Sequence, residues 1–356
     1  MARNAILFFF ICSTILVFAT PTESISIKSD SDSKNQKFNP GEMIMHHIID
    51  SHEWHILDWK DKSISIPLPI IVFHEGKGIR AFMSSKFNHG KTNYAGYKMD
   101  HGKIVAVDRV GAINKEETEK LWDFSITKNV FSLFFSIIIM LVIFLRISKI
   151  YIQDANKTPK GLRGFLEIMI LFVRDDIAKP SIGDKHYKKY MPFLLTVFFF
   201  IWLNNLLGLI PLFPGGANLT GNIAVPMILA AMVFIITILS AKKTYWQHIF
   251  AMPGVPKPVL LILTPVEIMG MLLKPFVLMI RLFANITAGH IIILSFFSLI
   301  FIFGEINPGA GYGASLMSVA FVIFMSFLEL LVAFLQAYVF TLLSAIYFGN
   351  AVEEEH

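Results

Sequence analysis

Long apolar segments constrain this chain more than any other feature of its sequence. A helix needs about 20 apolar residues to cross a lipid bilayer. Five segments reach roughly that length or exceed it, at 125–147, 191–212, 223–241, 259–303 and 315–349. Of the 356 residues, 54% are hydrophobic and only 16% are charged, which is too apolar for an ordinary soluble domain. The sequence therefore predicts an all-α membrane protein, a polytopic helical bundle.

The last two apolar segments are longer than an upright span requires. The segment 259–303 would make a helix of about 67 Å, whereas the hydrocarbon core is about 30 Å thick. Neither Pro275 nor Gly289 is flanked by a polar loop at which the chain could turn back. We therefore expect two long, strongly tilted and kinked helices.

The first 19 residues have the pattern of a signal peptide. One early charge, Arg3, precedes an apolar core at Ile6–Phe18 and a small residue, Ala19. The alternative is an uncleaved first span, but this core is shorter than the roughly 20 residues that a span requires. Cleavage after Ala19 would also remove Cys12, the only cysteine, and with it any disulfide or thiol chemistry.

Residues 20–122 form a polar region between the signal peptide and the first span. Short strand-like runs at Ile64–Ile66, Ile70–Phe73 and Lys103–Val107 are interrupted by prolines and glycines. We predict a small exported domain containing β-strands at 20–122, followed by a transmembrane domain at 123–356.

Basic residues indicate the orientation of the spans. The connection 146–190 carries ten lysines and arginines, whereas 213–222 and 304–314 carry none. Because cytoplasmic loops are enriched in these residues, 146–190 is predicted to be cytoplasmic. Five spans then leave the N-terminal domain outside and the C-terminus inside. The net charge of +5 is thus explained without nucleic acid.

Charged residues occur within the apolar segments, where they are costly. Glu267, Lys274 and Arg281 are spaced by seven, so they share one helix face, which Asn285 extends. An arginine near the bilayer centre costs about 2.5–3.5 kcal/mol, so such residues are usually functional. The alternative is a structural Glu–Lys–Arg network that holds helices together.

A second polar face lies in the final segment. Glu329, Gln336 and Tyr347 fall on one side of a helix, whereas His290 lies about 180° from Arg281 on an ideal helix. Histidine and glutamate, with reference pKa values near 6.5 and 4.3, exchange protons, whereas arginine stays charged up to about pH 12. Such a set suits a proton path with a fixed charge that blocks leakage, although a lone membrane histidine is more often an interhelical hydrogen bonder.

Two further types of site have little or no support in the sequence. Four histidines in the N-terminal region could ligate zinc, but they are weak candidates because no second group has a fixed spacing. These are His46, His47, His52 and His55. No G-x-x-x-x-G-K-[ST] loop is present, so we expect no nucleotide chemistry and no cofactor on this chain.

The transmembrane region resembles subunit a of the F-type ATP synthases. The resemblance is carried by Met279–Asn285 followed by Ala288-Gly289-His290, by Asn205–Pro211, by Thr264–Glu267 and by Leu335–Phe340, and it covers about 125–356. Two departures stand out. Ala284 replaces the usual glycine, and His290 and Glu329 exchange the residue types that many bacterial members have.

This resemblance implies a non-catalytic stator in a bacterial inner membrane. Arg281 would face the carboxylates of a rotating c-ring, and b subunits of the peripheral stalk would be further partners. An outer half-channel would contain Asn285, His290, Glu329 and Gln336, and an inner one Glu267 and Lys274. Alternatives are a sodium-translocating version of the same subunit, or a membrane-anchored binding protein whose exported domain does the work.

Overall fold

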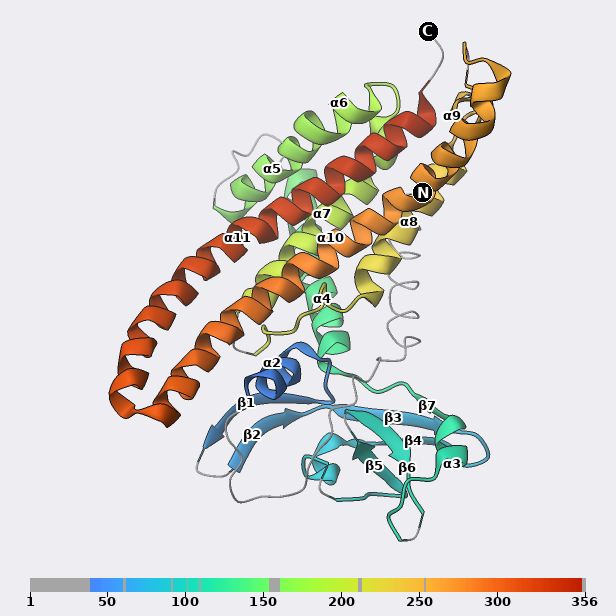
Figure 1. The fold of residues 1–356 in the computed structure, drawn as a ribbon. Helices are drawn as coiled ribbons and strands as arrows, with labels where there is room; N and C mark the ends of the chain where they lie inside the picture. The colour runs from blue at the N-terminus through green and yellow to red at the C-terminus, as the bar shows by residue number, and fades with distance from the viewer. Residues whose placement is uncertain are drawn as a thin grey trace.

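The computed structural model describes residues 39–353, apart from 60–61, 91, 101, 109, 154–160, 211–212 and 253. The chain forms a helical bundle with a smaller, strand-rich N-terminal domain at one end (Figure 1). The helical fold with a small strand-containing region is as predicted. The predicted signal peptide, 1–19, lies outside the described residues.

In its described part, the N-terminal domain contains helix α2 (Pro40–Ile48) followed by three small antiparallel sheets. The sheets pair β1 (Glu53–Trp59) with β2 (Lys62–Pro67), β3 (Pro69–His74) with β4 (Gly78–Met83) and β7 (Leu121–Asp123), and β5 (Tyr97–Asp100) with β6 (Lys103–Ala106). The 3-10 helix η1 (Ser84–Phe87) and helix α3 (Lys115–Glu119) connect them. All three strand-like runs of the sequence are strands.

Alternating burial explains why β3 anchors this domain. Ile70 and Val72 are fully buried, and they pack with Phe87, Tyr97 and Ile104 into one small core. Successive residues of a strand point to opposite faces, so only alternate residues need to be apolar on the core side.

Among the described residues, the bundle consists of nine helical segments. They are α4 (Lys128–Gln153), α5 (Leu162–Phe172), the π-helical η2 (Val173–Ala178), α6 (Lys179–Ile182), α7 (Tyr187–Leu209), α8 (Ala224–Ser240), α9 (Lys243–Phe250), α10 (Lys257–Ile306) and α11 (Pro308–Val352). In the described part of the chain, α4, α7, α10 and α11 are long and apolar enough to cross a membrane. A fifth span is obtained if α8 and α9, bent by 104°, are counted together.

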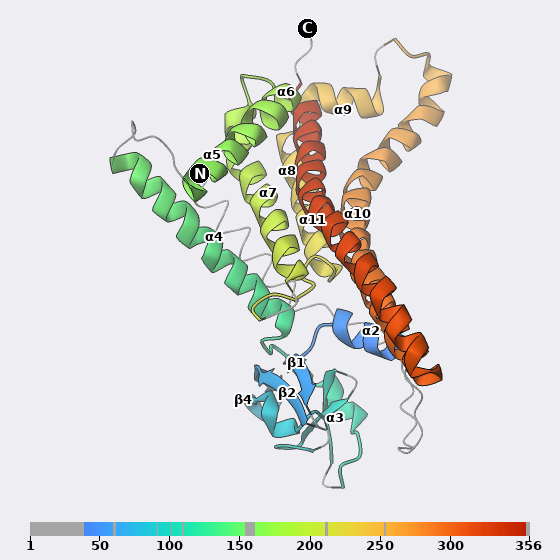
Figure 2. The same cartoon turned by 90° about the vertical axis from the view of Figure 1, so that its left-hand side faces the viewer.

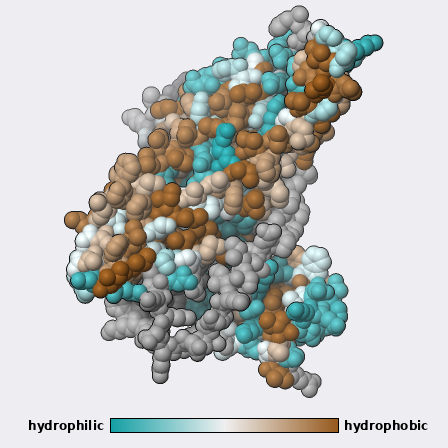
Figure 3. All heavy atoms as spheres, viewed as in Figure 1, coloured by the Kyte–Doolittle hydropathy of each residue, from teal (hydrophilic) through white to brown (hydrophobic). Residues whose placement is uncertain are grey.

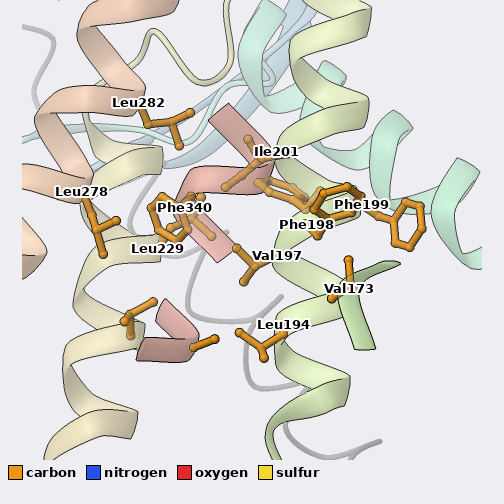
Figure 4. Close-up of a cluster of buried hydrophobic side chains, with 14 of the residues drawn as sticks. Val173, Leu194, Val197, Phe198, Phe199, Ile201, Leu229, Leu278, Leu282 and Phe340 are labelled. Atoms are coloured by element: carbon orange, nitrogen blue, oxygen red, sulfur yellow. The ribbon is translucent and has the colours of Figure 1, made fainter. Parts of the chain in front are cut away.

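Helix α7 lies at the centre of the bundle core (Figure 4). Its Leu194, Val197 and Ile201 are fully buried and meet Leu229 of α8 and Phe340 of α11. This burial explains why α7 is apolar around most of its circumference, as a helix enclosed by others must be.

Helices α10 and α11 form one long antiparallel hairpin (Figures 1 and 2). They have 50 and 45 residues, and Pro265 and Pro275 lie inside α10 without ending it. The hairpin turns at Asn307, whose side chain accepts a hydrogen bond from the N–H of Gly309 at 2.8 Å. At 1.5 Å per residue α10 is about 75 Å long, so it must tilt or protrude from a core of about 30 Å.

Aromatic side chains attach the N-terminal domain to the bundle. The ring of Trp54 in β1 packs edge-on against Phe131 of α4 at 5.7 Å and against Phe213 at 5.2 Å. Trp54 is only 4% exposed. The domain therefore lies at the start of α4, beside the α10–α11 turn, whereas α11 ends at the opposite end of the bundle (Figure 2).

Candidate functional site

The pairing of α10 with α11 decides which polar residues meet. Near the turn, a Cβ on Gly311 would lie only 2.8 Å from the Cα of Gly304, so the backbones touch there. Further along, the rings of Phe296 and Phe321 stack at 5.1 Å. These contacts fix the register of the two helices over the stretch that carries the candidate residues.

Glu329 of α11 lies against the α10 turn that carries His290. A Cβ placed on Gly289 would be 3.0 Å from the Cδ of Glu329 and would collide with its Oε1. That oxygen is enclosed and has no hydrogen-bond partner among the described residues, and both Glu329 and His290 are half-buried. The structure thus places Glu329 and His290, the two residues of the expected outer half-channel that can exchange protons, on facing turns of α11 and α10.

Lys274 and Arg281 lie by Tyr347, nearer the other end of the pair. The ammonium of Lys274 is 5.7 Å from the centre of the Tyr347 ring, a cation–π distance. The charge of Arg281 also acts on the phenol of Tyr347. Tyr347, which the sequence placed on the polar face of α11, therefore contacts Lys274 of α10.

Glu267 lies about two turns before Lys274, where α9 approaches α10. Its charge acts on Tyr245 of α9, and Tyr245, Lys274 and Tyr347 line one small pocket between α8, α9, α10 and α11. No ion pair joins Glu267, Lys274 and Arg281 to one another within the described part of the chain. The structural Glu–Lys–Arg network that the spacing allowed is not formed.

The face of α10 next to Arg281 is open and lined by small residues. Ala284, Asn285 and Ala288, which lie three, four and seven positions beyond Arg281, are exposed, and Arg281 itself is half-buried. Residues at these spacings share one side of a helix. On the side toward the hairpin turn, another helix could therefore approach Arg281 closely without meeting a large side chain of α10, whereas Val277, four positions before Arg281, is exposed on the other side.

The hairpin exposes much more apolar surface than the other spans. In the most apolar windows of α10 and α11 only 6% and 11% of residues are buried, against 33% in α4 and 50% in α7. Figure 3 shows this surface as largely hydrophobic, with a hydrophilic patch over the middle of the α10–α11 pair. Such a surface requires lipid or another apolar protein against it.

Asn205 was not identified from the sequence as part of a buried polar lining near the residues of the expected outer half-channel. Asn205 of α7 accepts a hydrogen bond from the hydroxyl of Thr220 at 2.8 Å, and its Nδ2 donates to the carbonyl of Ala333 in α11 at 3.4 Å. Gln336, about one turn beyond Ala333, is 6% exposed. Since Asn204 also lies in this apolar run, the asparagine pair was the signal that could have revealed a polar lining.

The histidine candidates for zinc do not assemble into a site among the described residues. The side chains of His46, His47 and His55 lie outside the described residues. His52 instead contacts Asp123 of β7, with Nε2 3.0 Å from Oδ2. Burial would raise the pKa of Asp123, but hydrogen bonds from His52 and Ser125 outweigh it and lower the pKa. His52 therefore links the segment before β1 to β7, the last strand of the domain.

Comparison with known proteins adds two family matches. A family model described as "ATP synthase A chain" matches residues 130–349, and one described as "Domain of unknown function (DUF8433)" matches residues 43–124. The first match contains every candidate of the two proposed half-channels, and the second contains most of the N-terminal domain.

Curated relatives match about two thirds of the chain. "ATP synthase subunit a 2" of Chlorobaculum tepidum is 46% identical over 236 residues, which are 65% of this chain and 64% of that protein. "ATP synthase subunit a" of Chloroherpeton thalassium is 43% identical over 238 residues, 66% of this chain and 68% of that protein. The match thus spans about two thirds of each relative.

Proposed function

The chain belongs to the ATP synthase A chain family, and from that premise we propose that it is the proton-translocating stator subunit of an F-type ATP synthase. The observation that carries the proposal is the open, small-residue face beside Arg281, on a hairpin whose apolar surface is mostly left uncovered by the described part of the chain. A rotating ring of helices is a partner that would need both features.

Arg281 is suited to be the barrier of such a machine. Its guanidinium stays protonated at any working pH, so it attracts a carboxylate and cannot relay a proton. As each ring carboxylate passes, Arg281 would hold it in the charged form. A proton would then be unable to pass directly from one side of the membrane to the other.

The other polar groups are arranged on both sides of Arg281. Asn285 and His290 follow Arg281 toward the hairpin turn. Together with Glu329 and Gln336 of α11, they would form the outer half-channel. Toward the start of α10 lie Lys274 and Glu267, which would form the inner one. Glutamate and histidine can take up and release protons, which supports a proton path.

Orientation and partners follow from the same assignment. The N-terminal domain and the α10–α11 turn share one end of the molecule, and the end of α11 is at the other (Figure 2). We propose that the first end faces outward from a bacterial inner membrane, with c-ring and b subunits as partners. The ring carboxylate decides between protons and sodium, so ATP synthesis that is unchanged when sodium is removed would support protons.

Two variants at one position test the proposal. Arg281→Ala should abolish ATP synthesis while the complex still assembles, because the variant loses a charge that is costly in the membrane. Arg281→Lys should fail nearly as badly, because lysine lacks the planar five-donor fork and can lose its proton when desolvated. ATP synthesis, passive proton leak and copurification with the ring would be measured for both variants.

The control is Arg146→Ala, which removes an exposed arginine from α4 and should leave synthesis unchanged. Normal synthesis with lysine at 281 would refute the barrier role. It would favour a structural charge instead.

A further inference from the structure

The sheet of β4, β3 and β7 in the N-terminal domain is apolar on both of its faces. Ile70 and Val72 of β3 point to one face, where they form the small core with residues of β5 and β6. Because successive residues of a strand alternate between faces, Ile71 and Phe73 point to the other. An antiparallel sheet with one face in water normally carries polar side chains there. This sheet does not.

The strand register brings large apolar side chains together on that second face. Phe73 pairs with Ile79 of β4 on one side and with Trp122 of β7 on the other, and directly opposite residues share a face. Ile79, Phe73 and Trp122 are 72%, 38% and 57% exposed. No charged residue of the three strands points to this side. The surface, here named the apolar sheet face, consists chiefly of Ile71, Phe73, Ile79, Ala81, Met83 and Trp122.

Hydrogen bonds attach this sheet to the start of the first apolar helix of the bundle. The N–H groups of Phe124 and Ile126 donate to the carbonyls of Ile71 and Pro69, at 2.8 and 3.0 Å. Ile126 is two residues before Lys128, where α4 begins, so this hydrogen-bonded link ends within about 7 Å of the helix. The sheet is therefore fixed at the end of α4 rather than held by a free tether.

The apolar sheet face is turned toward the bundle end of the domain. In Figure 1, β3 lies between the bundle and the β5–β6 hairpin, which is on the far side of the domain. Because the core side of β3 packs against β5 and β6, its other side looks toward the bundle. Helix α4, which begins there, is long and apolar enough to cross a membrane. The bilayer around α4 is thus the apolar layer next to this face.

We propose that the apolar sheet face rests on the bilayer and that its side chains enter the interfacial layer of the lipids. An exposed apolar surface of this kind needs an apolar partner, and the boundary between headgroups and acyl chains provides one. Tryptophan is enriched at this boundary, which suits Trp122. The N-terminal domain would in this way be held flat on the membrane beside α4.

This inference goes beyond the proposed function of the subunit. It requires only that α4 crosses a bilayer, and it holds for either orientation of the chain. Its test therefore does not involve Arg281 or either half-channel, and the two proposals can fail separately.

The test measures whether a residue of the apolar sheet face touches lipid. Ile79→Cys, in a Cys12→Ser background, is labelled with a small fluorophore. The full chain, with the subunits that copurify with it, is then reconstituted into phosphatidylcholine vesicles in which some lipids carry a nitroxide quencher high on the acyl chain. The label at position 79 should lose most of its fluorescence to the lipid quencher and resist iodide added to the water.

Val110→Cys is the matched control. Val110 is also an apolar residue of this domain and is 91% exposed, but it lies on the loop after β6. Its label should be quenched by iodide and not by the lipid. If Ile79→Cys does not assemble, Met83→Cys takes its place, since Met83 is 42% exposed on the same face of the same strand.

Three outcomes would overturn the proposal. Equal quenching by iodide at positions 79 and 110 would show that the face lies in water. Protection of the label at 79 from both quenchers would show that a protein covers the face instead. The third outcome concerns Trp122→Glu, which should expose the label at 79 to iodide, because a charge opposes entry into lipid. Lipid quenching that is unchanged by Trp122→Glu would mean that only the label, and not the sheet face, enters the bilayer.

Discussion

The carboxyl group of Glu329 in α11 rests against the backbone of Gly289 in α10, leaving no room for a side chain at position 289. Glycine is unfavourable inside a helix by roughly 0.5–1 kcal/mol relative to alanine. Its presence here is explained by the carboxyl group that occupies the space of the missing Cβ, one residue from His290.

The first prediction concerns this contact. Gly289→Ala should displace the Glu329 carboxyl and reduce ATP-driven proton pumping several-fold, although alanine favours the helix itself. Proton uptake would be measured in inside-out vesicles, together with copurification of ring and stator. Gly270→Ala is the matched control, since a Cβ at this α10 position meets nothing within 4 Å. Equal effects of the two variants would contradict a role for the contact.

The second prediction concerns His290 and Glu329 as a pair. His290→Glu alone leaves two carboxyl groups on facing turns, and Glu329→His alone leaves two imidazoles, so each should slow pumping. The double variant restores one group of each type and should pump faster than either single variant. The three are compared in ATP-driven proton uptake, where coupling between neighbours appears as non-additivity. A double variant impaired by the sum of the two single effects would show that they act independently.

The third prediction concerns orientation. Asn88 lies exposed in the N-terminal domain, and Lys188 lies exposed at the start of α7. In a Cys12→Ser background, an impermeant thiol reagent should label Asn88→Cys in intact cells stripped of the outer membrane. It should label Lys188→Cys only in inside-out vesicles. The opposite pattern of labelling would overturn the proposed topology.

Much of the helical fold could be predicted because apolarity and helical period are properties of consecutive residues. The segment 259–303 was expected to be one long helix, and α10 runs unbroken from Lys257 to Ile306. The segment 223–241 also agrees with α8, Ala224–Ser240, but the sharp bend into α9 was not predicted. Such a bend depends on what α9 packs against, which local composition does not reveal.

The candidate site could be predicted from the sequence only in part. A spacing of seven placed Lys274 and Arg281 on one face, and both do lie near Tyr347 of α11. The buried amide of Asn205 was missed, since an uncharged residue in an apolar run is a weak signal. Its partners, Thr220 and Ala333, come from other elements.

By itself the sequence determined where the long apolar helices lie and the cost of placing Arg281 among them, because each is a sum over neighbouring residues. Only the tertiary structure decided that Glu329 meets Gly289 and that Asp50 accepts a hydrogen bond from the N–H of Asn129. These contacts join residues far apart in the chain. They depend on the register of one antiparallel helix pair and on how the N-terminal domain packs at the start of α4, and shifting either by one helical turn would separate the same residues without changing the sequence pattern.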